Sequence, residues 1–174
     1  MERKEKLTLR KYRSSDLDRL CELFIDKDVL DSLSGLLTLK NINKKNETKW
    51  LKEALKKYRE KKPSRLDWVI EVNGVYVGGI GAQEINWDNQ NTEIGYWIGK
   101  PYWGKGYATE AVKQVAQILF NKYKFVRISA KAFADNMASQ RVLEKAGFKY
   151  EGTLRKNAKR KNKFVDDKLY AIVR

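Results

Sequence analysis

Alternating apolar and polar positions open the chain, and helical spacing follows them. Leu7–Tyr12 alternate, which predicts a strand. In residues 14–26 the apolar positions recur every three or four residues, which predicts an amphipathic helix with Ser14 or Ser15 as its N-cap. Cys21 falls on the apolar face of this helix, so we expect a core residue and not a nucleophile.

A second helix and a run of strands are predicted next. The helix covers residues 47–61, with Asn46 as its N-cap. Strand patterns then occupy residues 66–72, 75–85 and 92–99. Asn73 and Gly74 form the strongest short hairpin signal, so we expect three antiparallel strands here.

The second half of the chain interleaves helices with strands. Ala108 opens a helical stripe, and residues 136–148 form a helix capped by Asn136 and closed by Gly147. Strands are predicted over residues 125–133, 149–155 and 164–174. This order predicts an α+β domain, one sheet with helices on its faces.

The composition describes a globular protein. The chain has 174 residues, 42% of them hydrophobic, and no Pro/Gly/Ser linker divides it, which predicts one domain over residues 1–174. Histidine is absent, which excludes Ser-His-Asp and Cys-His catalysis and histidine metal sites. A single cysteine forms no internal disulfide, and we expect no bound metal.

The formal net charge of +15 raises the question of a polyanionic partner. Basic residues cluster in Lys40–Lys62 and in Arg155–Lys163, which are candidates for docking on RNA or the ribosome, with a solvated surface as the alternative. No apolar run approaches the ~20 residues needed to cross a bilayer, and the charged first residues lack a signal-peptide pattern. We therefore expect a cytoplasmic protein that does not associate with a membrane. For the oligomeric state we expect a monomer or a homodimer.

A glycine-rich loop lies within residues 95–112, GYWIGKPYWGKGYATEAV. Its match to the phosphate-loop pattern GxxxxGK[ST] ends at Gly106, which lacks the hydroxyl that holds Mg²⁺, so nucleotide hydrolysis is disfavoured. Gly104, Gly106 and Ala108 let a ligand approach the backbone at a helix N-terminus. Such a site suits a diphosphate, and an ordinary turn is the alternative.

This loop and a second motif, NMASQRVLEKAGFKYEG, resemble the GNAT superfamily of acetyl-CoA-dependent N-acetyltransferases, most of all its RimJ/RimL-like branch of ribosomal-protein N-terminal acetyltransferases. The family pattern Gln/Arg-x-x-Gly-x-Gly/Ala falls on residues 103–108, with Trp103 in first place. The resemblance implies the acyl-CoA N-acyltransferase fold. That is a single mixed, mainly antiparallel sheet of about seven strands flanked by about four helices.

The resemblance also implies acetyl-CoA as co-substrate and assigns residues to it. Backbone N–H groups would hold the diphosphate, from Trp103, Gly104, Lys105, Gly106, Tyr107, Ala108 and Thr109. The fourth and fifth strands would splay apart after residues 96–98, and pantetheine would add there like a short strand, along the backbone of Trp97 and Ile98. Asn136 would contact the pantetheine arm besides capping its helix.

Catalytic candidates follow from the same resemblance. Ser139 matches a proposed general acid for the departing thiolate, and a first-turn serine that only satisfies backbone is the alternative. Tyr150 and Tyr107 are weaker candidates for this acid. Glu93 and Glu84 are the candidates for the general base.

The resemblance implies that the acceptor is an amine of a peptide, a protein or a small molecule, which attacks directly in a ternary complex. An α-amine with a pKa near 8 is about a tenth neutral at pH 7, against about one in 2,500 for lysine, so a weak base favours an N-terminal α-amine. Small-molecule acceptors (an antibiotic, an amino acid or a polyamine), a non-catalytic acyl-CoA sensor and a basic RNA-binding module are the alternatives. Polycations require acidic residues at the mouth, for which the candidates are Glu22, Asp26, Asp28 and Asp31.

Overall fold

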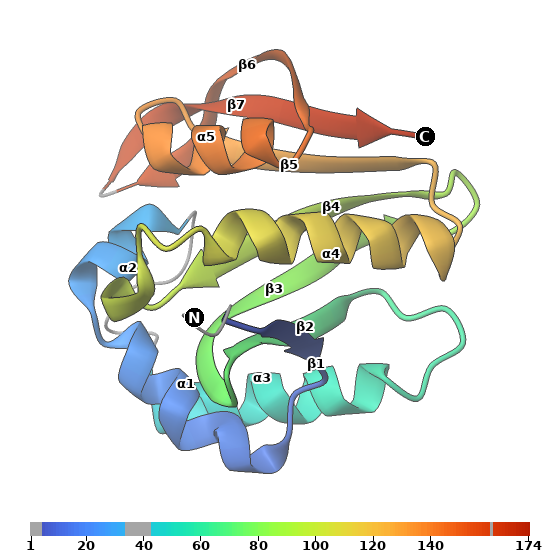
Figure 1. Cartoon of the computed structure of the whole chain (residues 1–174). Helices are drawn as coiled ribbons and strands as arrows, with labels where there is room; N and C mark the ends of the chain where they lie inside the picture. Colours follow the sequence, from blue (N-terminus) through green and yellow to red (C-terminus); the bar gives the residue numbers. More distant parts are fainter. Residues whose placement is uncertain (1–4, 34–42, 161) are drawn as a thin grey trace.

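A seven-stranded mixed sheet organises the chain, as expected (Figure 1). The computed structural model describes residues 5–33, 43–160 and 162–174. In the order β1-β2-β3-β4-β5-β7-β6, all neighbours pair antiparallel except β4 and β5, which are parallel. The strands are β1 (Leu7–Arg10), β2 (Leu66–Val72), β3 (Val75–Asn86), β4 (Asn91–Ile98), β5 (Arg127–Phe133), β6 (Lys149–Arg160) and β7 (Lys163–Val173).

The described residues form five α-helices, divided between the two faces of the sheet. They are α1 (Leu17–Phe24), α2 (Lys27–Ser32), α3 (Lys44–Lys57), α4 (Tyr107–Asn121) and α5 (Met137–Lys145). One hydrophobic core joins α4 and α5 to the strands, and a second core joins α1, α2 and α3 to the other face. Helices on both faces are therefore confirmed. Within the described residues, no helix has the length and apolar character required to cross a membrane.

Three details of the predicted helices were wrong, namely the N-caps of the first and second predicted helices and a short helix that was missed. The N-cap of α3 is Asn43, whose side chain accepts a hydrogen bond from the backbone N–H of Asn46, the residue expected to cap. A separate short helix, α2, follows α1, and Asp26 caps it. Cys21 is half-buried at the edge of the apolar face of α1, so it lies less deeply than expected.

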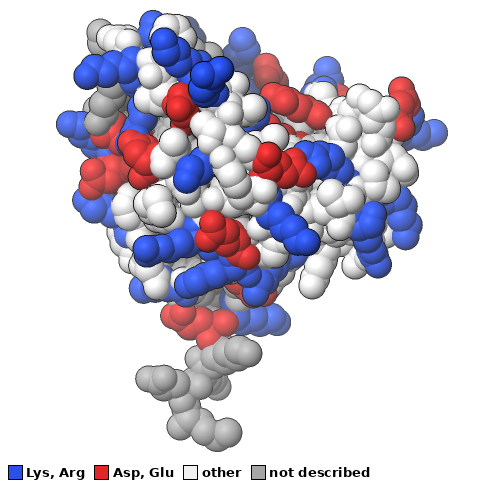
Figure 2. Space-filling model, turned by 90° about the horizontal axis from the view of Figure 1, so that it is seen from above, with Lys and Arg blue, Asp and Glu red and all other residues white. Residues whose placement is uncertain are grey.

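The basic segment at residues 155–163 lies in the β6–β7 hairpin, and part of its charge is paired within the chain. Arg160 forms an ion pair with Asp135 at 2.9 Å, and Asn157 donates to Asp167. On the face seen from above, Lys and Arg side chains are interspersed with fewer Asp and Glu side chains (Figure 2). Lys40, in the other basic cluster, lies outside the described residues.

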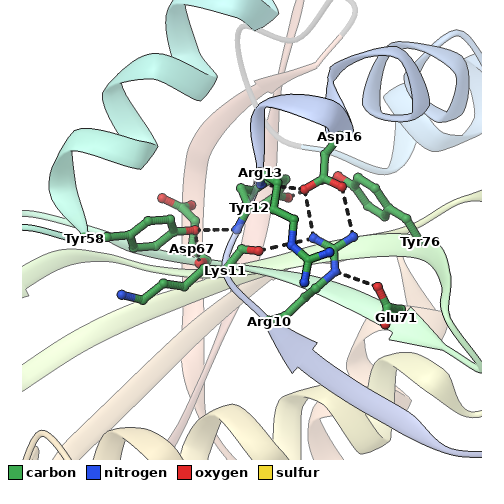
Figure 3. A network of polar contacts seen from close by, with 9 residues as sticks. All are labelled: Arg10, Lys11, Tyr12, Arg13, Asp16, Tyr58, Asp67, Glu71 and Tyr76. Carbon is green, nitrogen blue, oxygen red and sulfur yellow. Dashed lines mark hydrogen bonds and ion pairs between the residues drawn. The ribbon is translucent and has the colours of Figure 1, made fainter.

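An ion pair fixes the turn from β1 into α1 (Figure 3). The guanidinium of Arg10 donates to both oxygens of Asp16, at 2.8 and 2.9 Å, and to Glu71 at 2.6 Å. Asp16 also accepts from the backbone N–H of Arg13 at 2.7 Å. Neither Ser14 nor Ser15 caps the helix, because both lie in a short 3-10 turn that the Asp16 carboxylate organises.

Candidate active site

The parallel strands β4 and β5 separate after a short contact. They pair at three positions, the last of which joins Glu93 to Ser129. The separation therefore begins at Ile94, earlier than the expected point after residues 96–98. From there the edge of β4 that faces β5 is open along the described strands.

The hydrogen-bond ladder decides which β4 residues face this opening. The N–H of Gly99 donates to Val77 of β3 at 2.8 Å, and antiparallel bonds recur at every second residue. The backbone of Trp97 thus points to Gly79 of β3. The backbone N–H and C=O groups of Tyr96 and Ile98 point instead to the open side. There the Ile98 carbonyl accepts a hydrogen bond from the indole Nε1 of Trp103 at 2.6 Å.

Two clefts meet at this part of β4. The aromatic cleft, of about 490 Å³, is lined by Tyr12, Phe24, Glu47, Trp50 and Trp97 among others. The α5 cleft, of about 410 Å³, is lined by Glu84, Glu93, Lys131, Asn136, Ser139 and Asp167 among others. Gly95 and Tyr96 line both clefts, so the two clefts adjoin at β4, and we call them together the groove.

A pair of hydroxyl groups lies at the junction. The Tyr96 Oη is 2.8 Å from the Ser139 Oγ and donates to the Ser139 carbonyl oxygen at 3.1 Å. Burial raises the pKa of Tyr96 to about 12, although the hydrogen bond to Ser139 opposes the rise, so Tyr96 carries its proton at neutral pH. Asn136 accepts from the Ser139 backbone N–H at 3.0 Å, which confirms it as the N-cap of α5.

The two carboxylates predicted from the sequence differ in their surroundings. Glu93 is held in an ion pair with Lys131 at 2.8 Å. Burial lowers the pKa of Lys131, but the hydrogen bond and charge of Glu93, with smaller contributions from Glu84 and Asp167, outweigh it and raise that pKa. Glu84 is exposed at a bulge with φ +50° and lines the same cleft.

The glycine loop leaves its backbone accessible. Gly104 and Gly106 have φ of +76° and +80°, and a Cβ added at either would meet nothing within 4 Å. The helix α4 begins at Tyr107 without a side-chain cap from the described residues, so the N–H groups of its first turn, including Ala108 and Thr109, are available to a ligand. The ammonium of Lys105 lies 5.8 Å from the ring centroid of Tyr102.

The two tyrosines considered as weaker acids are engaged elsewhere. The Tyr107 hydroxyl donates to Glu5, and the Tyr150 hydroxyl lies 2.7 Å from that of Thr153. Neither tyrosine lines either cleft. The Tyr96–Ser139 pair therefore supplies the hydroxyl groups at the junction of the two clefts, and Tyr12 supplies another in the aromatic cleft.

The acidic cluster expected at the mouth is committed to other contacts. Glu22 pairs with Arg19, Asp28 pairs with Lys100, Asp26 caps α2, and Asp31 also has an interaction of its own. The groove contains Glu47 instead, which is 7% exposed, and sequence reasoning missed it. A signal was present, because Glu47 stands one helical turn before Leu51 on the apolar stripe of α3.

Tyr96 and Lys131 were also missed. Tyr96 meets Ser139 across 43 residues of sequence, and Lys131 meets Glu93 between two strands that pair in parallel. No local pattern marks either contact. Only the assembled sheet brings these side chains together.

Comparison with known proteins agrees with this geometry. The acetyltransferase (GNAT) domain family matches residues 6–149. The uncharacterized N-acetyltransferase YoaA of Bacillus subtilis (strain 168) is 31% identical over 172 residues, which cover 98% of this chain and 94% of that protein.

Solved structures share the fold. A structure of RimL, an α-N-acetyltransferase of a ribosomal protein, in complex with coenzyme A superposes with a TM-score of 0.87 at 20% identity, covering 96% of this chain and 93% of that one. Spermidine N-acetyltransferase from Vibrio cholerae, in complex with coenzyme A and spermine, gives 0.83 at 18% identity, covering 96% and 95%.

Proposed function

The chain belongs to the GNAT family and is an acetyl-CoA-dependent N-acetyltransferase, and we propose that its acceptor is the N-terminal α-amine of a peptide or protein. The observation that carries the proposal is the Tyr96–Ser139 hydroxyl pair at the junction of two clefts. One cleft can hold the thioester end of the donor and the other the acceptor.

The residues present fit acetyl-CoA. The diphosphate would bind the backbone N–H groups from Trp103 to Thr109, where Gly104 and Gly106 leave space at the N-terminus of α4. The 3′-phosphate would meet Lys105. Pantetheine would pair with the open edge of β4 at Tyr96 and Ile98, because the backbone of Trp97 is directed to its hydrogen-bond partner on β3. It would also contact Asn136.

Bound acetyl-CoA supplies a thioester, to whose carbonyl carbon the neutral amine adds as a C–N bond forms and the C–S bond breaks. The backbone N–H of Ile98 donates to the carbonyl oxygen as charge develops there. Ser139, hydrogen-bonded to Tyr96, gives a proton to the departing sulfur and regains one from water. The proton lost by the amine passes to Glu84 or to water, because protonation of Glu93 would break its ion pair with Lys131.

An α-amine suits this site because the groove offers a weak base. About a tenth of an α-amine is already neutral at pH 7, so little base strength is required. The α5 cleft is also lined by more carboxylates than ammonium groups. The carboxylates are those of Glu84, Glu93 and Asp167, and the ammonium groups are those of Lys131 and Lys159. That excess of negative charge favours a cationic substrate within a strongly basic protein.

The test is thiol release from acetyl-CoA with peptides that begin with Ser, Ala or Met, and with free amino acids, polyamines and aminoglycosides. Turnover on peptides alone would support the proposal. Turnover on a small amine alone would show that this amine, and not a peptide, is the acceptor. Glu84→Gln and Glu93→Gln, assayed beside the parent, rank the two carboxylates. A larger loss in kcat at Glu93 would assign the base to the ion-paired residue.

Absence of turnover, together with firm coenzyme A binding, would instead favour an acyl-CoA sensor. Docking on RNA is tested separately, by the salt dependence of binding to ribosomal RNA. Reversal of Arg155 and Lys156 to Glu should weaken any such binding without changing peptide turnover, because neither residue lines a cleft.

A further inference from the structure

The aromatic cleft contains a carboxylate that no described side chain neutralises. Glu47 lines the cleft from α3 and is 7% exposed. Among the described residues its carboxylate has neither a hydrogen bond nor an ion pair, and burial raises its pKa. The Glu47 oxygens are not among the fully buried unpaired polar atoms of the described residues, so they keep some contact with solvent. A carboxylate so largely shielded from water and without a protein partner favours a cation that arrives with a ligand.

The other charges of this cleft cancel each other. Arg65 donates to both oxygens of Asp67, each at 2.7 Å, and its guanidinium lies over the ring of Trp50 at 5.3 Å. Arg65 and Asp67 together carry no net charge, which leaves Glu47 as the uncompensated group of the cleft. The cleft is thus negative within a chain whose formal net charge is +15.

Aromatic rings surround the space beside Glu47. Tyr12 and Trp50 meet edge to face at 5.0 Å, and Phe24 and Trp97 pack at 4.3 Å. Gly79 lies beneath, where a Cβ would stand 2.5 Å from the Tyr12 hydroxyl and 2.7 Å from the Trp97 indole nitrogen. A carboxylate beside aromatic faces is the combination that binds ammonium and guanidinium groups.

Glu47 lies in a different cleft from Ser139, the proposed general acid. It lines the aromatic cleft and not the α5 cleft that contains Ser139, with Gly95 and Tyr96 between them. The nitrogen that attacks the thioester must be neutral. A carboxylate away from Ser139 therefore serves a different group, one that stays charged through the reaction.

We propose that Glu47 binds a second, permanently charged group of the acceptor, an ammonium or guanidinium. The inference rests on the proposed transfer to an amine and narrows its substrate class to amines that carry a further cation. In a peptide this is an N-terminal α-amine followed closely by a basic side chain.

The test compares two peptides that differ by one charge, Ser-Arg-Ala-amide and Ser-citrulline-Ala-amide. For the parent enzyme we expect KM for the arginine peptide to be ~10-fold lower, with similar kcat. Glu47→Gln should remove this preference and leave kcat for the citrulline peptide unchanged. Glu53→Gln is the matched control, because Glu53 is an exposed glutamate on the same helix that lines neither cleft.

Equal KM values for the two peptides in the parent enzyme would overturn the inference, as would a preference that persists in Glu47→Gln. A second readout, quenching of tryptophan fluorescence by the same peptides, keeps the two proposals apart. If neither peptide turns over, the proposed acceptor fails. Tighter binding of the arginine peptide by the parent than by Glu47→Gln then still supports the role of Glu47, and equal binding overturns it.

Discussion

The hydroxyl groups of Tyr96 and Ser139 lie 2.8 Å apart, although 43 residues separate them in the sequence. The contact joins β4 to the first turn of α5 at the point where β4 and β5 have separated. It places two exchangeable protons where the two clefts meet. Because burial keeps Tyr96 protonated, the pair is a hydrogen-bond donor at every physiological pH.

Removal of the Ser139 hydroxyl should slow the transfer step. For Ser139→Ala we expect kcat to fall about tenfold, a small effect for a general acid because a thiol of pKa near 8.5 is already a tolerable leaving group. The Asn136 cap uses the backbone N–H of residue 139 and survives the change. Stopped assays of thiol release should show the loss in kcat with an unchanged KM for acetyl-CoA.

The same assay tests whether the two hydroxyls act together. Tyr96→Phe combined with Ser139→Ala should cost no more than the larger single change, because the groups share one proton path. Ser129→Ala, a serine on β5 that donates weakly to the Thr92 carbonyl, is the control and should match the parent. Fully additive losses would show that Tyr96 and Ser139 act independently.

Gly106→Ala should weaken coenzyme A binding. An alanine at φ +80° costs about 1–2 kcal/mol of backbone strain, and its Cβ would enter the open space where the diphosphate approaches. We expect the Kd for coenzyme A to rise about tenfold by calorimetry. Gly74→Ala, at φ +82° in the β2–β3 hairpin with nothing within 4 Å, carries the same strain away from the loop. An equal rise in Kd for both variants would contradict a ligand at Gly106.

Asp16→Ala should destabilise the fold strongly. The change leaves Arg10 without its bidentate partner and the N–H of Arg13 without its acceptor, in a site where the Asp16 side chain is 8% exposed. Breaking a largely buried ion pair costs about 3–5 kcal/mol, measured as the free energy of unfolding in urea. Asp18→Ala removes an exposed pair with Lys44 and should cost less than about 1 kcal/mol. Similar losses of unfolding free energy in both variants would show that Asp16 does not organise the turn from β1 into α1.

Local patterns in the sequence predicted most of the strands and helices correctly. The hairpin at Asn73 and Gly74 has the positive φ angles that its residue types favour, at +49° and +82°. Asn136 caps α5 as its position before an amphipathic run indicates. In these cases a short-range rule and the final fold agree.

The sequence could not predict the features that depend on tertiary contacts. Ser14 and Ser15 favour a cap by composition, but the bidentate contact between Arg10 and Asp16 closes the turn instead. The partner of Ser139 and that of Glu93 depend on how β4 and β5 separate, which no spacing encodes. The exception is Glu47, because its place on the apolar stripe of α3 follows from helical spacing alone.

The buried carboxylate of Glu47 gives the fold a stability that depends on pH. Burial raises its pKa in the folded state above the unfolded value of about 4.3. An acid of this kind imposes no penalty below the unfolded pKa, and the penalty grows with pH until the folded pKa is passed. Glu47→Gln should therefore leave the free energy of unfolding nearly unchanged at pH 4 and raise it at pH 7.

Urea unfolding at the two pH values measures this difference directly. Cys21, Tyr76 and Lys44 do not titrate between pH 4 and pH 7, because burial raises the pKa values of the Cys21 thiol and the Tyr76 hydroxyl and the ion pair with Asp18 raises the pKa of Lys44. Glu53→Gln, on the exposed face of α3, should show no such pH dependence. A Glu47→Gln variant less stable than the parent at pH 7 would mean that the carboxylate has a partner in the free protein. A more stable variant that has also lost its preference for a second cation would show that the same group limits stability and selects the acceptor.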